Sequence, residues 1–360
     1  MRTRPGSSCV WTACVVLLLA GVVAVSLLVG RVAGADMSFA LALPNVVIPP
    51  VQGKTGSFDI MEVDQAAHRL YVADRTDTGV DVFDVSSPAA RYLKTIPAGT
   101  GTNGVSVAKN VNKLFVTTND SRVLIVDVNP PSPHYDTVIA SLSTGGKKRT
   151  DELDYDPRDR KMYVANSDDG IVTAIDAVGN RIIKRFLNLG DGLEQPRYDA
   201  GNGMMYLTSS DQNAVFQFDP ARDVLVKKFD VGAACNPNGL GINPKTNQAL
   251  LGCSNKKTPM AALWDLNAGK VIQTFTQVGA GDMMLYSPQA DLFFFAASNY
   301  PPAPVMGVFT ATGVHWVANI PTLRGAHAVA FDETNHVLYT INQAPNQAGL
   351  IAFWLQSIPR

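Results

Sequence analysis

The stretch that decides the fold runs from residue 153 to residue 187 and reads LDYDPRDRKMYVANSDDGIVTAIDAVGNRIIKRFL. It holds four short runs with strand character, separated by turns rich in Asp, Asn and Gly: Leu153–Tyr155, Met162–Ala165, Ile171–Ile175 and Arg181–Leu187. Runs of this length bounded by such turn residues are typical of antiparallel strands. Four strands in about 40 residues predict one blade of a β-propeller.

The same pattern recurs seven times along the chain. An aromatic residue or a leucine marks the second strand of each copy, at Tyr71, Phe115, Tyr163, Tyr206, Leu250, Phe294 and Tyr339. The residues ten and eight positions before each marker are apolar in every copy, as expected for the buried face of a strand. A single blade cannot bury both of its faces, so neighbouring blades must stack. Residues 36–360 are therefore predicted to form one all-β domain, a seven-bladed propeller of four-stranded blades.

One segment is left over once the blades are counted. Ala40–Ile48 is apolar and precedes the first blade, and it is predicted to add a strand to the last blade beside Ile351–Leu355. An N-terminal strand would thus close the ring and remove an open sheet edge.

The composition narrows the class of protein further. Hydrophobic residues make up 46% of the chain and charged residues 17%, which excludes a disordered protein. The formal net charge is -1, so the chain lacks the basic field of a typical nucleic-acid-binding protein, and no nucleic-acid partner is expected.

The first 35 residues have the features of a targeting segment. Arg2 and Arg4 precede an uncharged stretch over 10–30, and Ala33-Gly34-Ala35 suits a signal peptidase. We predict a cleaved signal peptide over 1–35. The alternative is an N-terminal membrane anchor, because about 20 apolar residues can span a bilayer. In either case we expect a periplasmic or secreted propeller that contacts a membrane only through residues 10–30, and only if the leader stays uncleaved.

Two cysteines lie outside the leader, Cys235 and Cys253. In an oxidising compartment they are predicted to form one disulfide between neighbouring strands of the fifth blade, beside Asn238. The alternative is two free thiols. The sequence contains no C-x-x-C or C-x-x-C-H motif, so it carries no sign of covalent haem. The motif G-T-G-T-N-G over 99–104 precedes no helix, so no nicotinamide site is predicted.

The repeat resembles that of a known family. Three segments, Tyr71-Val72-Ala73-Asp74, Phe115-Val116-Thr117-Thr118-Asn119 and Tyr163-Val164-Ala165-Asn166, are similar to the Tyr-Val-Thr-Asn repeat of exported bacterial propellers like YncE. The resemblance covers about residues 40–355 and implies a fold rather than an activity. Relatives of this broad type include extracytoplasmic binding proteins and subunits of amine dehydrogenases. This chain matches none of the cofactor-attachment motifs of those enzymes.

A column of polar residues predicts the functional face. The residue twelve positions before each marker, at the start of each predicted inner strand, is polar in every copy, and we call this set the polar ring: Asp59, Asn103, Asp151, Glu194, Asn238, Asp282 and His327. The starts of the inner strands gather at one mouth of a propeller tunnel. A hard cation such as Ca²⁺ prefers oxygen ligands, which gives Asp59, Asp151 and Glu194 as predicted metal ligands. The side chains of Asn103, Asn238 and Asp282 would bind a small ligand. Below them we expect a dry collar, which is the ring of apolar residues ten positions before the markers.

The simpler interpretation of the polar ring is a set of solvated turn residues. Four carboxylates at one mouth would nevertheless repel one another without a cation or shifted pKa values. The basic run over 145–149, next to Asp151, is expected to be solvated, and the alternative is that it recognises an anionic group. The other histidines fall in predicted turns and connections, so no multi-histidine metal site is expected: His68, His134, His315 and His336.

Two functions follow from this face. The first is a binding or scaffold protein that takes a cation, a small molecule or a protein partner at the tunnel mouth. The alternative is a hydrolase in which Ca²⁺ polarises a lactone or ester carbonyl while His327 steers the attacking water. Calcium-dependent lactonase-type propellers use a similar set of Glu, Asn and Asp ligands, which is an analogy between folds.

Overall fold

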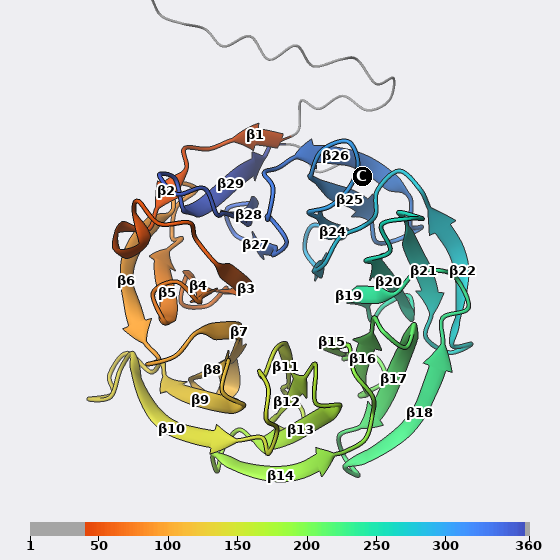
Figure 1. Ribbon diagram of the computed structural model, residues 1–360, viewed down its shortest axis with the longest axis horizontal. Coiled ribbons are helices and arrows are strands. Elements are labelled where there is room, and N and C mark those ends of the chain that lie inside the picture. Colours follow the sequence, from red (N-terminus) through yellow and green to blue (C-terminus); the bar gives the residue numbers. More distant parts are fainter. Residues whose placement is uncertain (1–39, 357–360) are drawn as a thin grey trace, which may run out of the picture. The chain divides into compact units, whose positions relative to one another are not determined.

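The computed structural model describes residues 40–356, and these residues form seven antiparallel sheets arranged as the blades of a ring (Figure 1). Six sheets have four strands, and the seventh has five. Two short 3₁₀ helices, Pro49–Val51 and Lys109–Val111, are the only helices within residues 40–356. The prediction of an all-β, seven-bladed propeller is confirmed. The predicted leader lies outside the described residues.

Each blade contributes an inner strand, two middle strands and an outer strand. The inner strands lie around the centre of the ring (Figure 1): β3 (Phe58–Asp64), β7 (Thr102–Ala108), β11 (Leu153–Asp156), β15 (Leu193–Tyr198), β19 (Pro237–Asn243), β23 (Met284–Ser287) and β27 (Ala330–Asp332). The second strands carry the markers of the repeat: β4 (Arg69–Asp74), β8 (Lys113–Thr118), β12 (Lys161–Asn166), β16 (Met205–Ser209), β20 (Gln248–Cys253), β24 (Leu292–Ala297) and β28 (Val337–Asn342).

The third and fourth strands complete the blades. The third strands are β5 (Gly79–Asp84), β9 (Arg122–Asp127), β13 (Ile171–Asp176), β17 (Ala214–Asp219), β21 (Ala261–Asp265), β25 (Val305–Thr310) and β29 (Gly349–Leu355). The outer strands are β6 (Arg91–Pro97), β10 (Thr137–Ser143), β14 (Arg181–Phe186), β18 (Val224–Asp230), β22 (Lys270–Phe275), β26 (Trp316–Pro321), β1 (Ala40–Ala42) and β2 (Val46–Val47). The predicted strands of the third blade agree with β11–β14 to within one residue at each end.

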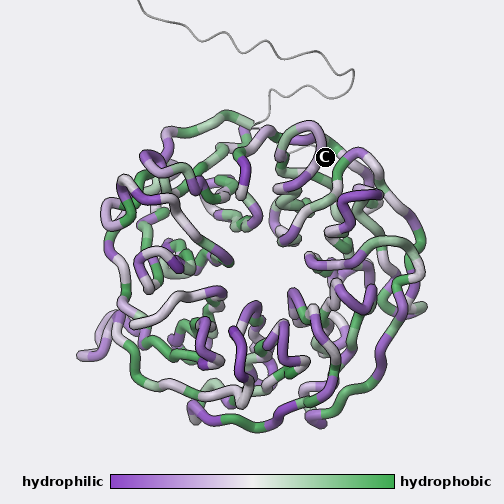
Figure 2. Tube along the Cα trace, viewed as in Figure 1, coloured by the Kyte–Doolittle hydropathy of each residue, from purple (hydrophilic) through white to green (hydrophobic). Residues whose placement is uncertain are grey.

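The core lies between the blades, on the two faces of each sheet. All seven marker residues are buried, with at most 1% of their surface exposed. Hydrophobic residues follow the strands, whereas the loops are largely hydrophilic (Figure 2). Burying a large apolar side chain contributes roughly 1.5–3 kcal/mol, so this repeated burial stabilises the ring at every blade interface.

Short polar side chains shape the turn between the first and second strands. The Oδ1 atom of Asp64 accepts hydrogen bonds from the backbone N–H groups of Ala66 and Ala67, at 3.0 and 3.1 Å. Asp156 and Asp332 make the same pair of bonds in their blades. His68 and His336 end their turns with positive φ angles of 51° and 56°, as turn residues do. Their predicted placement in turns is confirmed.

The ring closes through the N-terminal strand. Ala40, Leu41 and Ala42 of β1 pair with Leu355, Trp354 and Phe353 of β29. Val46 and Val47 of β2 pair with Leu350 and Gly349 farther along the same strand. The predicted closure is confirmed, but the segment forms two short strands rather than one. No helix in the described part of the chain is long and apolar enough to cross a membrane.

Candidate binding site at the tunnel mouth

The structure brings members of the polar ring together across blade boundaries. The Nε2 atom of His327 lies 3.0 Å from Asp59 Oδ1, which links the seventh blade to the first. The Nδ2 atom of Asn238 donates to Asp282 Oδ1 at 3.2 Å, which links the fifth blade to the sixth. Glu194 accepts a hydrogen bond from Ser210 of its own blade at 2.9 Å. These contacts place the ring residues at one end of the inner strands.

An arginine that the sequence analysis did not single out completes the ring between the first two blades. Arg75 follows β4, and its backbone N–H donates to Ser57 O at 2.9 Å. Its guanidinium forms an ion pair with Asp59 and donates from Nε to Asn103 Oδ1 at 2.7 Å. Asn103 in turn donates from Nδ2 to Thr150 O at 2.6 Å. Two predicted site residues are therefore held by one cation.

A second arginine faces the third blade's part of the ring. The Nη2 atom of Arg149 lies 2.9 Å from Asp151 Oδ2, and its Nε atom lies 3.7 Å from Asp168 Oδ2. Its side chain is only 38% exposed, whereas that of Asp151 is 7% exposed. The expectation that the basic run over 145–149 is simply solvated is therefore wrong for Arg149. This residue neutralises a ring carboxylate.

Burial and mutual repulsion shift the pKa values of the ring carboxylates upward. Burial, with the neighbouring charge of Asp59, raises the pKa of Asp151 to about 7. Burial and the charges of Asp282 and Asp151 hold the pKa of Glu194 well above its usual range. The pKa of Asp282 is also raised, chiefly by burial. The repulsion expected from the sequence is thus relieved by partner cations and by protonation.

His327 is a cation within this network. Burial alone would lower its pKa, but the hydrogen bond and charge of Asp59, with the charge of Asp282, raise the pKa to about 9. Both ring nitrogens face acceptors, because Nδ1 lies 2.7 Å from Gly325 O. An imidazolium that donates from both nitrogens cannot accept a proton from water. This state does not suit the predicted role of His327 as a base at neutral pH.

The layer below the polar ring differs from the predicted dry collar. The Oε1 atom of Gln195 accepts backbone N–H groups from Leu240 at 2.6 Å and from Met284 at 3.1 Å, on the next two blades. Glu152 is only 3% exposed, and burial holds its pKa well above the usual range. Inner strands have a free edge toward the tunnel, and their N–H groups need acceptors. Polar side chains below the ring meet that need in part.

A cavity of about 830 Å³ opens beside the ring between the sixth, seventh and first blades. Its wall includes four charged or ionisable side chains, Arg75, Asp282, Arg324 and His327. Amides from Asn299, Asn342 and Gln343 add hydrogen-bonding groups, and Phe58, Leu323 and Pro345 add apolar surface. Arg324 is exposed and forms no ion pair within residues 40–356.

The residues present do not fit a resident calcium ion. Among residues 40–356, no group of three or more His, Cys, Asp or Glu side chains is arranged to hold a metal ion. Asp59 and Asp151 already contact the cations Arg75, His327 and Arg149. A divalent ion would have to displace or repel those groups.

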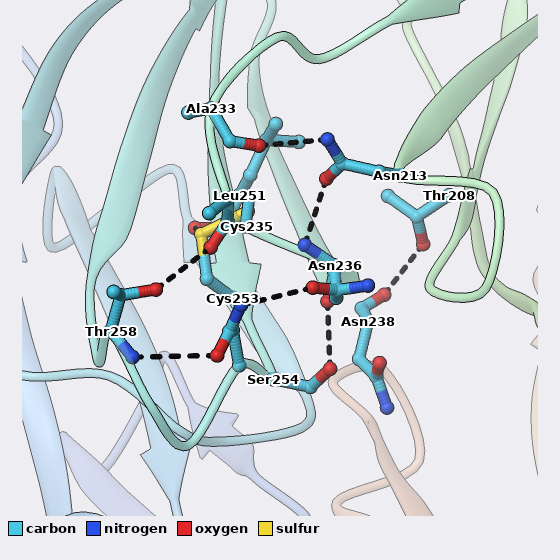
Figure 3. The surroundings of a disulfide bond; sticks show 12 residues. Thr208, Asn213, Ala233, Cys235, Asn236, Asn238, Leu251, Cys253, Ser254 and Thr258 are labelled. Atoms are coloured by element: carbon cyan, nitrogen blue, oxygen red, sulfur yellow. Dashed lines mark hydrogen bonds between the residues drawn. A yellow bond between two sulfur atoms is a disulfide. The ribbon is translucent and has the colours of Figure 1, made fainter.

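The predicted disulfide joins Cys235 to Cys253 at the same end of the fifth blade (Figure 3). Cys235 lies two residues before β19, in the preceding loop, which folds back to meet Cys253 in β20. Asn213 holds this loop by donating to Ala233 O at 2.7 Å and accepting from Asn236 N at 2.8 Å. The bridge therefore fixes the loop that leads into Asn238.

The fold and the ring define the class of protein, a seven-bladed β-propeller with a polar tunnel mouth. No family model matches the sequence, and no curated protein matches it. Solved structures share the fold, among them "Structure of U3-55K", with a TM-score of 0.69, 11% identity, and coverage of 89% of this chain and 99% of that chain. "Crystal structure of RRP9 WD40 repeats" gives the same TM-score, identity and coverage.

A chain of "Crystal Structure of Mitotic Checkpoint Complex" matches with a TM-score of 0.65, 15% identity, and coverage of 94% of this chain and 99% of that chain. Likeness at such low identity shows the fold alone. Function must therefore be argued from the chemistry of the site.

Proposed function

We propose that this chain is an exported propeller of the YVTN-repeat type that binds a small anionic molecule in the cavity beside the polar ring. The observation that carries the proposal is the charge of that cavity. Three cationic side chains line it, Arg75, Arg324 and His327, against one carboxylate, Asp282, whose pKa is raised. The family and export rest on the repeat and on the leader.

The three cationic side chains differ in whether a carboxylate of the protein already contacts them. Asp59 occupies one side of Arg75 and one nitrogen of His327, so these two groups supply a fixed positive field. Arg324 contacts no carboxylate in the described region and is exposed, so it is the group most available to a ligand. A planar guanidinium matches a carboxylate or a phosphate with two parallel hydrogen bonds. The shared chemistry of the ligand is therefore a carboxylate or phosphate group.

The size and lining of the cavity suit a small organic anion. Ligand pockets commonly span roughly 300–1,000 Å³, and this one is about 830 Å³. Phe58, Leu323 and Pro345 offer apolar contact, while Asn299 and Gln343 offer hydrogen bonds. Such a mixture favours a molecule with a carbon skeleton over an inorganic ion. A calcium-dependent hydrolase is not proposed, because Arg75, Arg149 and His327 already pair with carboxylates of the polar ring.

Calorimetric titration tests the proposal with matched probes. Succinate represents a carboxylate, glucose 6-phosphate represents a phosphate, and glucose is the neutral control. We expect one anion to bind saturably and glucose not to bind. The variant Arg324→Gln should weaken binding about tenfold, the effect of losing roughly 1.4 kcal/mol from a charge-assisted bond.

The matched control is Lys184→Gln, which removes an exposed positive charge from the outer strand β14. It should leave binding unchanged. Binding of glucose as tight as that of the anions, or equal affinities for Arg324→Gln and the parent chain, would contradict an anion site at the mouth.

A further inference from the structure

A second cavity, of about 490 Å³, lies at the other end of the inner strands. Its wall includes Gln65, Gln289 and Glu333, which follow the ends of β3, β23 and β27. The mouth cavity is instead lined by residues that precede or begin those strands, such as Ser57, Asp282 and His327. No residue lines both cavities. The two sites are therefore distinct.

The wall of this cavity is built largely from one position of the repeat. The residue nine positions before the marker lines it in six blades, where it is Glu62, Asp154, Arg197, Gly241, Leu285 or Ala330. The charged members come from the first four blades, and the apolar members come from the last three. Lys109, from the second blade, adds one more charge on the same side.

Backbone contacts hold the two carboxylates in place. Glu62 accepts the N–H of Val107 at 3.2 Å, and Asp154 accepts the N–H of Tyr198 at 2.6 Å. Both donors belong to the inner strand of the following blade. Each carboxylate therefore spans a blade boundary.

Five charged side chains line this wall, Glu62, Lys109, Asp154, Arg197 and Glu333, and the first four do not pair with one another. None of Glu62, Lys109, Asp154 and Arg197 forms an ion pair within residues 40–356. Glu333 accepts a hydrogen bond from Ser287 at 2.8 Å, so the wall as a whole holds three carboxylates and two cations. Glu62, Asp154 and Arg197 are half-buried, whereas Lys109 is exposed, and charges partly removed from bulk water are costly unless they find a partner. A ligand with separated positive and negative groups would supply partners for both signs at once.

The opposite wall is mostly apolar, although Gln289 and Glu333 also line it. Met283, Leu285, Val329 and Phe331 line it from the sixth and seventh blades. A ligand that fits the whole cavity must therefore carry a hydrophobic group as well as its two charges. An ammonium and a carboxylate on one carbon, with a large apolar side chain, meet these three demands in a small volume.

We propose that this cavity binds a hydrophobic α-amino acid of the size of leucine or phenylalanine. Glu62 and Asp154 take the ammonium group, Arg197 and Lys109 take the carboxylate, and Met283, Leu285 and Phe331 contact the side chain. The volume lies within the usual range for small-ligand pockets. This site is independent of the mouth cavity and of its ligand.

The raised pKa of Glu62 makes amino-acid binding depend on pH, which gives the proposal a second test. Burial raises its pKa to about 7, with the charge of Asp154 adding to the shift. Lys109, the Val107 N–H and the Ser106 hydroxyl act in the opposite direction. A bound ammonium favours the ionised carboxylate, so binding should release a proton. Affinity for the amino acid should therefore increase as the pH rises through about 7.

Calorimetric titration of the full chain with L-leucine tests the proposal. Three analogues each lack one recognised group: 4-methylpentanoate lacks the ammonium, isoamylamine lacks the carboxylate, and glycine lacks the side chain. We expect saturable binding of leucine and at least tenfold weaker binding of every analogue. Asp154→Asn and Arg197→Gln should each weaken leucine binding at least tenfold, and Arg197→Lys should restore part of the loss.

Control variants separate a local effect from a general one. Asp211→Asn and Lys184→Gln make the same changes at exposed positions outside this cavity, and both should bind leucine like the parent chain. Circular dichroism melts check that the variants fold. Absence of leucine and phenylalanine binding in the folded parent chain, or equal binding of leucine and its analogues, would overturn the proposal. Neither result bears on anion binding at the mouth.

Discussion

Removal of the Cys235–Cys253 bridge is expected to destabilise the propeller by about 3 kcal/mol. The two residues are separated by 18 positions in the sequence. In the chain-entropy account, a crosslink of about this length removes some 11 cal/mol/K from the unfolded chain, or about 3 kcal/mol at 25 °C. The unfolding entropy of a domain of this size is about 0.7 kcal/mol/K near its melting temperature, so the shift should be about 4–5 °C.

The assay compares thermal unfolding of the parent chain and of Cys235→Ala/Cys253→Ala, each with and without reductant. Reductant should lower the melting temperature of the parent chain but not that of the double variant, which is its own control for effects of the reductant. Both sulfurs are fully buried, so reduction of the native protein should require unfolding or denaturant. Titration of two free thiols in the unreduced, unfolded chain, with equal melting temperatures for both proteins, would refute the reasoning.

Three other predictions concern the mouth and the ring closure. Stability should fall as the pH rises from about 4 to 9. The raised pKa of Asp151 (about 7, ordinarily 3.8) gives a contribution that is lost between about pH 4 and 7, and the raised pKa of His327 (about 9, ordinarily 6.5) gives one that is lost between about pH 6.5 and 9. Melting curves across this range check the sign, and a flat profile would contradict it. Calcium or EDTA should leave the melting temperature unchanged, since Arg75, Arg149 and His327 already pair with the ring carboxylates; a stabilising shift with calcium would restore the metal hypothesis. Ala42→Pro, which places a proline in the closing strand β1, should lower the melting temperature by several degrees, whereas Ser87→Pro in an exposed turn serves as the comparison.

The architecture could be predicted because the decisive information is local and repeated. Each copy places an apolar pair two residues apart before a buried marker. In five of the seven copies an Asp or Asn then caps the chain reversal, as Asp64 does. Seven copies of one pattern leave little room for another arrangement. The closing strand could also be predicted, because one apolar segment remained without a partner after the blades were assigned.

The detailed register of the inner strands could not be predicted in the same way. Counting in steps of two along each inner strand would place the polar ring on the same face as the two apolar columns. Four inner strands instead carry irregularities between their first residues and the apolar columns, among them Phe58/Met61 in β3 and Thr102/Val105 in β7. A bulge adds a residue and reorients the side chains before it. Alternation in steps of two therefore does not predict which way a side chain points at the tunnel mouth. The distance from the marker does predict which end of the strand the residue occupies.

Arg75 was missed for a different reason. The residue four positions after each marker is polar in every blade, at Arg75, Asn119, Ser167, Ser210, Ser254, Ser298 and Gln343. Ser210 contacts Glu194, and Ser298 and Gln343 line the mouth cavity, so this column faces the same site. Only the first blade carries a charge there. A residue type found in one of seven copies is not part of the pattern that the copies share.

This difference between the blades explains why a repeated sequence predicts the fold more readily than the binding site. Side chains common to all blades serve burial and turns, which every blade needs equally. A binding site needs different groups at different points around one axis, so it must be built from positions where the copies disagree. The position nine before the marker shows the same logic, since it is charged in three of the first four blades and never in the last three. In a propeller sequence, the columns that lie near the axis and vary most in charge are therefore the first places to look for a ligand.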